Sequence, residues 1–294
     1  MGSQPSPPLR ATAADLPVAV AEALADPGPG RVRTVKAAGY AWCAIAWGNP
    51  GDPPLLLVHG VTSSAETFWR VGPALAAAGR SIIAVDLPGH GRTGGWRGRH
   101  RFAETAADLA GFIRAAGLER ADLDVLGHSW GAMVVAALPG AGLRPRRLIL
   151  LDPPSLRIAD LLRLTTDPLE RRYGSLTEAI AAVRAAGVSW SDGDVRAKAI
   201  ALTEVDEAAA RAVVLDNGDF DAGLAALAEP AARDVPVWLI RGEWAEGGMI
   251  PDEDLPRLAG RIGKDRVTTI AGGPHSPQRT HPEATVLAIL RALA

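Results

Sequence analysis

The sequence has few of the residues that would indicate a disulfide-bonded, membrane-spanning or nucleic-acid-binding protein. Its 294 residues include one cysteine, Cys43, which excludes an intrachain disulfide and a cysteine-based zinc site. No 18 consecutive apolar residues occur, so we expect no membrane-spanning helix. The 31 basic residues are balanced by 33 acidic ones without a long basic run. We therefore expect neither a nucleic acid nor a membrane as partner.

The first thirty residues lack the features of a secretion signal. No basic segment leads into an unbroken apolar stretch, because Asp15 and Glu22 interrupt the apolar part of this region. We interpret residues 1–30 as an N-terminal extension and expect a cytoplasmic protein.

The rest of the chain alternates between strand-like and helix-like segments. Hydrophobic residues make up 48% and charged residues 22%, as in an ordinary globular enzyme. Short, nearly continuous apolar runs predict strands that are covered on both faces, at residues 55–58, 81–85, 123–126, 147–151, 235–240 and 266–270. Residues 31–36 and 40–47 predict an antiparallel hairpin, and residues 102–116 and 282–293 predict helices. This order predicts an α/β fold with a mostly parallel, doubly wound sheet.

The alternation stops between residues 153 and 234. This segment contains several helical candidates but no convincing buried strand, so we interpret it as a helical cap or lid inserted into the sheet domain. The core domain then consists of residues 31–152 and 235–294, and the cap is expected over the carboxyl edge of the sheet, where α/β proteins bind their ligands.

The strongest chemical signal is Gly127-His128-Ser129-Trp130-Gly131, between a predicted strand and a predicted helix. This is the context of a nucleophile elbow, in which glycines permit a strained turn that exposes the serine hydroxyl. A serine nucleophile needs a base, and His275 lies just after the last predicted strand, where the base is expected. A tetrahedral intermediate also needs two N–H donors for its oxyanion, and the candidates are the backbone amides of Val61 and Trp130.

Taken together, these motifs resemble the α/β-hydrolase superfamily from about residue 31 to the end. The motifs that carry the resemblance are, in chain order, His59-Gly60, Asp86-Leu87-Pro88-Gly89-His90-Gly91, Gly127-His128-Ser129-Trp130-Gly131, Arg241-Gly242-Glu243 and His275. The resemblance implies a serine hydrolase without cofactor or metal that acts on a small-molecule ester, lactone or amide, or in some branches on a carbon–carbon bond. Epoxide hydrolases and haloalkane dehalogenases of this fold use an aspartate nucleophile, so Ser129 argues against both.

The acid that should orient His275 departs from the family pattern. Many members have an aspartate three residues after the glycine that ends the penultimate strand, but this chain has Ala245 there. The remaining candidates are Glu243, Asp152 and Glu246. We rank Glu243 first, because it follows the strand directly on a lengthened loop, and Asp152, at the end of the preceding strand, second.

The sequence does not identify the substrate. We expect His59, Tyr173, Trp190 and Phe220 to be substrate-binding residues, although a hydrogen-bonded structural histidine is the preferred interpretation of His59. The leading hypothesis is hydrolysis of a carboxylic ester or lactone through an acyl-serine intermediate. A carbon–carbon bond hydrolase or lyase, and a slow-turnover ligand receptor on the same fold, are the alternatives.

Overall fold

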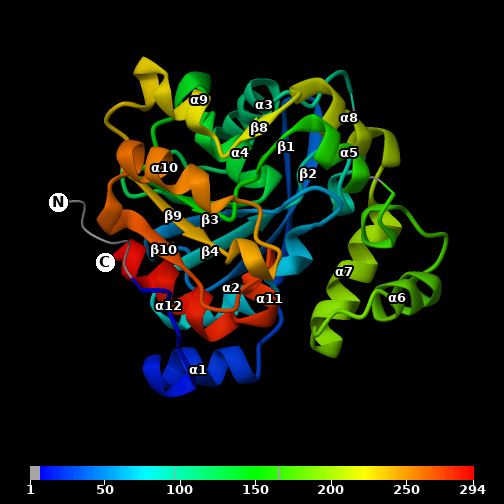
Figure 1. Cartoon of the computed structure of the whole chain (residues 1–294), viewed down its shortest axis with the longest axis horizontal. Helices are drawn as coiled ribbons and strands as arrows, with labels where there is room; N and C mark the ends of the chain where they lie inside the picture. The colour runs from blue at the N-terminus through cyan, green and yellow to red at the C-terminus, as the bar shows by residue number, and fades with distance from the viewer. Residues whose placement is uncertain (1–6, 96, 165) are drawn as a thin grey trace.

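The computed structural model describes residues 7–95, 97–164 and 166–294. Its central feature is an eight-stranded sheet with the order β1-β2-β4-β3-β5-β6-β9-β10 (Figure 1). The strands are β1 (Arg31–Ala37), β2 (Tyr40–Trp47), β3 (Pro54–Val58), β4 (Ser81–Val85), β5 (Asp124–His128), β6 (Arg147–Leu151), β9 (Val237–Arg241) and β10 (Val267–Thr269). β2 pairs antiparallel with both β1 and β4, and all other neighbours are parallel. The predicted α/β fold, with its hairpin and mostly parallel sheet, is confirmed.

Helices cover both faces of this sheet. The helices outside the segment between β6 and β9 are α1 (Val18–Ala25), α2 (Val71–Ala77), α3 (Phe102–Ala115), α4 (Trp130–Ala136), α10 (Leu255–Ile262), α11 (Pro277–Thr280) and α12 (Pro282–Leu293). Leu56 and Val58 of β3 pack into one core with α3 and α4, while Leu55 and Leu57 pack into the other with α1, α2 and α12. Successive strand residues point to opposite faces, which explains why the strands are apolar throughout.

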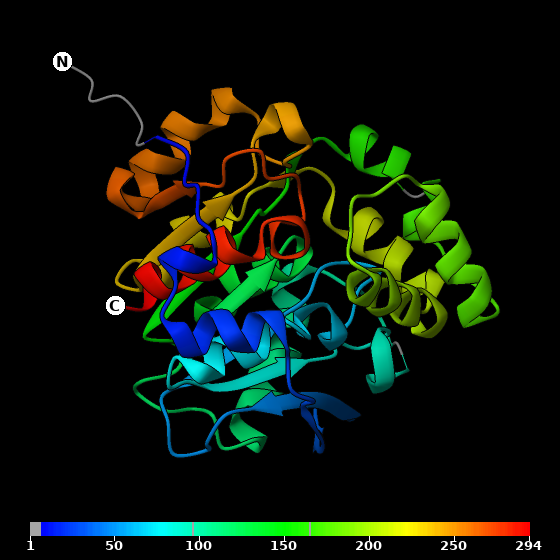
Figure 2. The same cartoon turned by 90° about the horizontal axis from the view of Figure 1, so that it is seen from below.

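The N-terminal extension adds to the second core. Leu16, Val20 and Leu24 are buried there, and Figure 2 shows α1, α2 and α12 on the same side of the sheet. Further upstream, Leu9 forms a parallel bridge with Ile270: its N–H donates to the carbonyl of Thr269, and its own carbonyl accepts from Ala271. The described part of the extension therefore covers one face and continues the β10 edge of the sheet.

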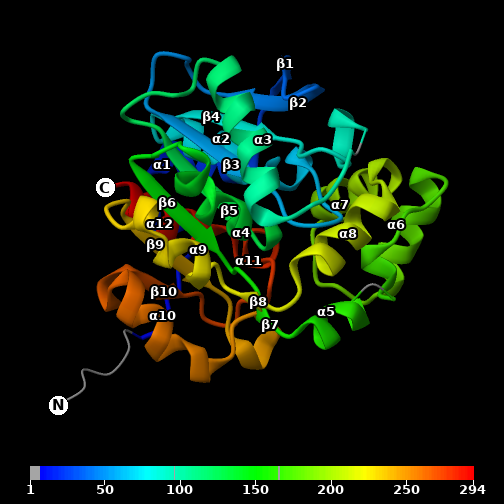
Figure 3. The same cartoon turned by 90° about the horizontal axis from the view of Figure 1, so that it is seen from above.

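Helices dominate the segment between β6 and β9. They are α5 (Ile158–Leu164), α6 (Leu176–Ala185), α7 (Asp192–Glu204), α8 (Glu207–Asn217) and α9 (Leu224–Ala228), and α5 to α8 lie to one side of the sheet (Figure 3). Two short strands that the sequence did not predict, β7 (Ser155–Leu156) and β8 (Phe220–Asp221), pair antiparallel where the chain leaves and re-enters the core. α9 packs on α4, and Leu227 belongs to the main core, so the end of the insertion packs against the sheet domain.

Candidate active site

Four loops meet at the carboxyl edge of the parallel strands. Ser129 follows β5, Asp152 follows β6, His275 lies beyond β10, and the Gly60–Val61 turn follows β3. Because β3, β5, β6, β9 and β10 run parallel and are neighbours in that order, their carboxyl ends lie along one edge of the sheet. Residues that are far apart in sequence are thereby brought to a single site.

The backbone at Ser129 has the strained geometry of a nucleophile elbow. Its φ is 56° and its ψ is −125°, a conformation that non-glycine residues rarely adopt. Both flanking glycines are required by close backbone contacts. A Cβ on Gly127 would lie 2.3 Å from the carbonyl oxygen of Gly131, and a Cβ on Gly131 would lie 2.3 Å from that of His59. The turn thus holds the serine side chain at the sheet edge, where it lines a cavity.

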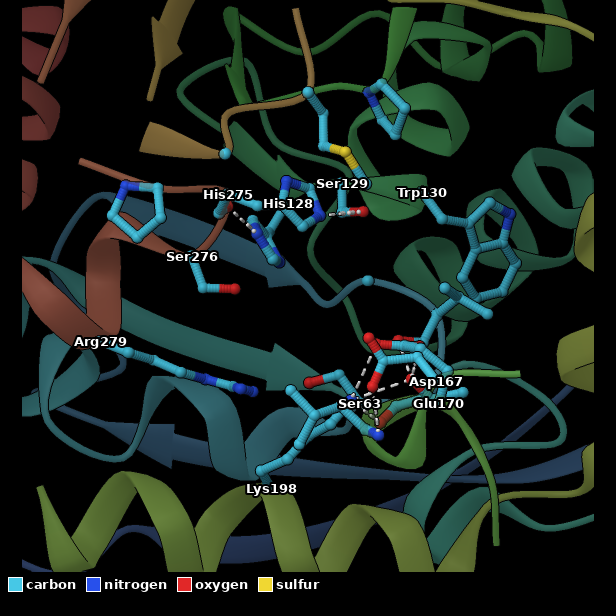
Figure 4. Close-up of a pocket in the computed structure, with 18 of the residues that line it drawn as sticks. Ser63, His128, Ser129, Trp130, Asp167, Glu170, Lys198, His275, Ser276 and Arg279 are labelled. Atoms are coloured by element: carbon cyan, nitrogen blue, oxygen red, sulfur yellow. Dashed lines mark hydrogen bonds and ion pairs between the residues drawn. The ribbon is translucent and has the colours of Figure 1, made fainter. Parts of the chain in front are cut away.

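A continuous chain of hydrogen bonds connects three of the predicted side chains, and Figure 4 shows the part between Ser129 and His275. His275 Nε2 lies 2.9 Å from Ser129 Oγ, and His275 Nδ1 lies 2.7 Å from Asp152 Oδ2. The Asp152 carboxylate is fully buried and also accepts the backbone N–H groups of Gly242, on Oδ1 at 2.9 Å, and Met249, on Oδ2 at 3.0 Å. These bonds hold a carboxylate against the histidine and leave Nε2 facing the serine hydroxyl, as a serine triad requires.

The structure places Asp152, and not the first-ranked candidate Glu243, at the histidine. Glu243 donates its backbone N–H to the carbonyl of Gly273, and its side chain has no hydrogen bond within the described residues. Glu246 is exposed at the cavity. The physical reason is sheet order: β6 lies directly beside β5, so the residue that follows β6 is next to Ser129, which follows β5. In addition, the Asp152 backbone has a φ of 44°, in the left-handed region that aspartate tolerates better than most residues.

The two predicted oxyanion donors lie beside the nucleophile. A Cβ on Gly60 would lie 2.9 Å from the Cβ of Ser129, so the β3 turn approaches the serine closely, and Val61 comes next in that turn. Trp130 begins α4, and an N–H in the first turn of a helix has no acceptor within the helix. Both residues line the cavity.

His59 does not line the cavity, contrary to its prediction as a substrate-binding residue and in agreement with the preferred interpretation as a hydrogen-bonded structural histidine. Its side chain is fully buried and outside the cavity lining. Nδ1 lies 2.7 Å from the carbonyl of Gly60, and Nε2 accepts the backbone N–H of Leu87 at 3.0 Å. Burial lowers the pKa of His59 to about 4, so the ring is neutral and joins the β3 and β4 turns.

A cavity of about 940 Å³ opens between Ser129 and His275 on one side and the insertion on the other. Trp190 and Phe220 line it, as predicted, together with the apolar side chains of Leu161 and Val213. Tyr173 was predicted to line it but does not: its hydroxyl donates to the carbonyl of Pro168, and its ring packs against the small core of α6 and α7. The volume is within the range of cavities that bind small organic molecules.

Sequence reasoning missed several polar residues at this cavity. His128 stacks on His275 with ring centroids 5.0 Å apart, and its Nε2–H donates to the backbone carbonyl of His275 at 2.9 Å. Burial lowers the pKa of His128 well below its usual value, so it stays neutral. Glu170, Lys198 and Arg279 also line the cavity. The only signal for His128 was its place within the elbow, and nothing in the sequence pattern distinguishes Lys198 or Arg279 from surface residues.

The described residues contain neither a candidate metal site nor a candidate membrane-spanning helix. There, no three or more histidine, cysteine, aspartate and glutamate side chains are grouped so that they could hold a metal ion. Nor is any described helix long and apolar enough to cross a bilayer.

Comparison with known proteins agrees with this geometry. The profile of the alpha/beta hydrolase family matches residues 55–289. Epoxide hydrolase B of Mycobacterium tuberculosis is 37% identical over 119 residues, which are 39% of this chain and 32% of that protein, so the match spans about a third of that relative's length. Pimeloyl-[acyl-carrier protein] methyl ester esterase of Edwardsiella ictaluri is 29% identical over 254 residues, covering 79% of this chain and 90% of that one. The solved structure of E-2-(acetamidomethylene)succinate hydrolase superposes with a TM-score of 0.72 at 23% identity, covering 89% of this chain and 98% of that one.

Proposed function

Because the chain belongs to the alpha/beta hydrolase family, we propose that it hydrolyses a carboxylic ester or lactone through an acyl intermediate on Ser129. The observation that carries this proposal is the chain of hydrogen bonds from Ser129 through His275 to Asp152. The similarity to a methyl ester esterase over most of both chains supports an ester substrate.

In the first half-reaction, Ser129 Oγ attacks the carbonyl carbon of the substrate while His275 Nε2 takes the hydroxyl proton. Asp152 stabilises the resulting imidazolium and keeps its Nδ1–H directed at the carboxylate. The backbone N–H groups of Val61 and Trp130 stabilise the negative charge on the carbonyl oxygen. His275 then returns the proton to the leaving alcohol as the carbon–oxygen bond breaks, which leaves the acyl group on Ser129.

In the second half-reaction, water takes the place of the alcohol. His275 removes a proton from the water as its oxygen attacks the acyl carbon, and the proton then passes to Ser129 Oγ as the acyl–serine bond breaks. The products are a carboxylic acid, an alcohol and the free enzyme. With a lactone the acid and the alcohol are parts of one molecule.

The nucleophile also separates this reaction from that of the epoxide hydrolases. Opening an epoxide on this fold proceeds through an ester formed with a carboxylate nucleophile, whereas the elbow here holds a serine. We therefore favour acyl transfer, although the relatives by sequence include epoxide hydrolases. We also propose that the inserted helices act as a cap that selects the substrate, since Trp190 lies in the insertion, Phe220 lies in β8 near its end, and both line the cavity.

The direct test combines turnover with covalent labelling. A panel of 4-nitrophenyl esters and lactones should reveal sustained turnover, and a fluorophosphonate should label Ser129. Ser129→Ala should lower kcat by about 10⁵ to 10⁶ without changing the circular dichroism spectrum, by analogy with removal of the subtilisin serine. A single slow turnover would instead support a receptor, and undiminished activity in Ser129→Ala would refute the proposal.

A further inference from the structure

The cavity wall contains a buried positive charge that the catalytic steps do not use. Arg279 lies in α11, four residues after His275, and lines the cavity although only 5% of its surface is exposed. In Figure 4 its side chain reaches from α11 into the cavity toward Ser63. Burial lowers the pKa of Arg279 to about 10, which still leaves the guanidinium charged at neutral pH.

The protein partners of Arg279 leave part of its guanidinium free. Nε and Nη2 both donate to Thr67 Oγ1, at 3.3 and 3.0 Å, and the group stacks 4.4 Å from the centre of the Trp190 ring. Thr67 therefore takes the edge of the guanidinium formed by Nε and Nη2. Within the described residues, Arg279 forms no ion pair with a carboxylate and Nη1 has no hydrogen-bond acceptor. The end formed by Nη1 and Nη2, with two parallel N–H groups, is the free one.

The two carboxylates whose charges act on Arg279, Asp194 and Glu170, are already engaged by other groups. Asp194 accepts from Arg70 at 2.9 Å, from Trp69 at 3.0 Å and from Ser191 at 2.6 Å.

Glu170 pairs with Lys198 at 3.4 Å and also accepts from the hydroxyl of Thr62. Arg70 and Lys198 therefore each pair with a carboxylate, Asp194 and Glu170 respectively, whereas Arg279 has no carboxylate within ion-pair distance in the described part of the chain. A buried guanidinium that no carboxylate contacts directly is costly, and a ligand that pairs with it would lower that cost.

A second polar group points to the same ligand. Ser63 lines the cavity, and only 5% of its surface is exposed. Its hydroxyl is buried and has no hydrogen-bond partner in the described part of the chain. An unpaired buried hydroxyl and an incompletely paired guanidinium line the same cavity, and both can donate hydrogen bonds to a ligand.

We infer that this wall is a binding site for a carboxylate on the substrate, remote from the bond that is cleaved, with Arg279 as the residue that determines this specificity. The inference rests on the proposed hydrolysis at Ser129 and names its substrate class: esters or lactones that carry a free carboxylate. The free end of the guanidinium matches the two oxygens of a planar carboxylate. A single guanidinium without an ion-pair partner suits a monoanion better than a phosphate dianion, because Lys198 is engaged by Glu170 and Thr62.

Turnover of paired esters tests the inference. The probes are mono-4-nitrophenyl esters of glutaric, adipic and suberic acids, each paired with the same ester whose terminal carboxylate is replaced by a carboxamide. We expect at least one carboxylate ester to have a kcat/KM about 100-fold above that of its carboxamide partner. Arg279→Gln should reduce this ratio to near one, mainly through KM, while leaving carboxamide turnover within about threefold. A ratio near one in the unaltered protein would overturn the inference.

Two further variants separate recognition from folding. Arg279→Lys retains the charge but lacks the two parallel donors, so it should restore part of the ratio, about tenfold, even if Arg279→Gln does not fold. Arg196→Gln removes the same charge from the exposed face of α7 and should leave the ratio unchanged. An unchanged ratio in folded Arg279→Lys would contradict the assignment.

A binding measurement distinguishes failure of this inference from failure of the proposed hydrolysis. Calorimetry with adipate and with adipamide on Ser129→Ala protein requires no turnover. Adipate should bind, adipamide should bind at least tenfold more weakly, and Arg279→Gln in the same background should abolish the difference. If no ester is hydrolysed but this pattern holds, only the proposed reaction is wrong. If esters are hydrolysed and adipate binds no better than adipamide, only the carboxylate site is wrong.

Discussion

Asp152 and His275 are 123 residues apart in sequence, and their side chains meet at 2.7 Å between Oδ2 and Nδ1. Asp152 therefore fixes which nitrogen of the histidine faces Ser129. Replacing one carboxylate oxygen by an amide group would favour the other tautomer, with the proton on Nε2, where a base is needed.

We expect Asp152→Asn to lower kcat by about 10⁴ with little change in KM, the effect described for the corresponding aspartate of serine proteases. Glu243→Gln is the matched control, because it makes the same chemical change on the loop after β9, and it should change kcat less than threefold. Steady-state kinetics with one 4-nitrophenyl ester measures both. The opposite order of effects would assign the acid to Glu243.

The sequence allowed us to predict features that depend on neighbouring residues. It did not identify features that depend on which elements lie side by side in the fold. The elbow around Ser129 needs glycines at fixed neighbouring positions, and the buried strands need unbroken apolar runs, so both can be recognised in the sequence. The acid can come from any loop that reaches Nδ1. The choice between Glu243 and Asp152 depended on which strand lies beside β5, and sheet order is not encoded in any single segment.

The prediction of the residues that line the cavity was partly wrong for a related reason. Trp190 and Tyr173 have similar aromatic character and both lie in the insertion, but one faces the cavity and the other packs against α6 and α7. Whether each side chain points into the cavity depends on how the short helices of the insertion pack, and composition does not reveal that packing. Arg279 was missed because an arginine is ordinarily exposed, and only the fold shows that this one is buried.

A group of buried histidines makes the stability depend on pH. His90 packs against both His59 and Trp130, with ring centroids 5.3 and 5.1 Å away, and His100 contacts the same tryptophan at 5.5 Å. Burial lowers the pKa of His59 and of His100 to about 4, and that of His90 well below its usual value. The unfolded chain, with histidine pKa values near 6.5, therefore binds more protons than the folded protein below that pH.

The free energy of unfolding should accordingly be highest above pH 6.5 and fall between pH 6.5 and 4. Each pKa unit corresponds to about 1.4 kcal/mol, so His59 alone accounts for a loss of about 3 kcal/mol. Urea unfolding at a series of pH values measures this. His90→Phe keeps the ring stack but cannot be protonated, so the decline should become shallower, even if loss of the contact with Pro88 costs about 1 kcal/mol at pH 7. The same slope in both proteins would contradict this explanation.

The insertion should set acyl preference without taking part in the chemistry. Trp190→Ala and Phe220→Ala enlarge the cavity, and we expect the preferred 4-nitrophenyl ester to shift toward longer or bulkier acyl groups, with about 1 to 3 kcal/mol of discrimination per methylene affected. Tyr173→Phe is the control, since this side chain does not line the cavity, and it should leave the preference unchanged. If the wild-type ranking of chain lengths survived in both alanine variants, the cap would not select the acyl group.

Lys198 connects the insertion to the proposed oxyanion loop. Its Nζ donates to the carbonyl of Thr62 at 3.0 Å and to its hydroxyl at 2.9 Å, and Thr62, with a φ of 50°, follows Val61 directly. α7 thus holds the strained turn that positions the Val61 amide. Lys198→Met preserves most of the side-chain volume and removes these bonds, so the turn should relax and the oxyanion donor should lose its alignment.

We expect Lys198→Met to lower kcat by about 10- to 100-fold, less than the 10² to 10³ described for deleting an oxyanion donor, because the amide remains but is misplaced. KM for a neutral ester should change little, which distinguishes this positioning role from a loss of substrate contacts. The double variant Lys198→Met/Glu170→Gln also removes the carboxylate that would be left without its partner, so it should recover stability but not kcat. Arg196→Met, on the exposed face of the same helix, is the matched control. Recovery of kcat in the double variant would show that the unpaired carboxylate, rather than the displaced loop, caused the loss.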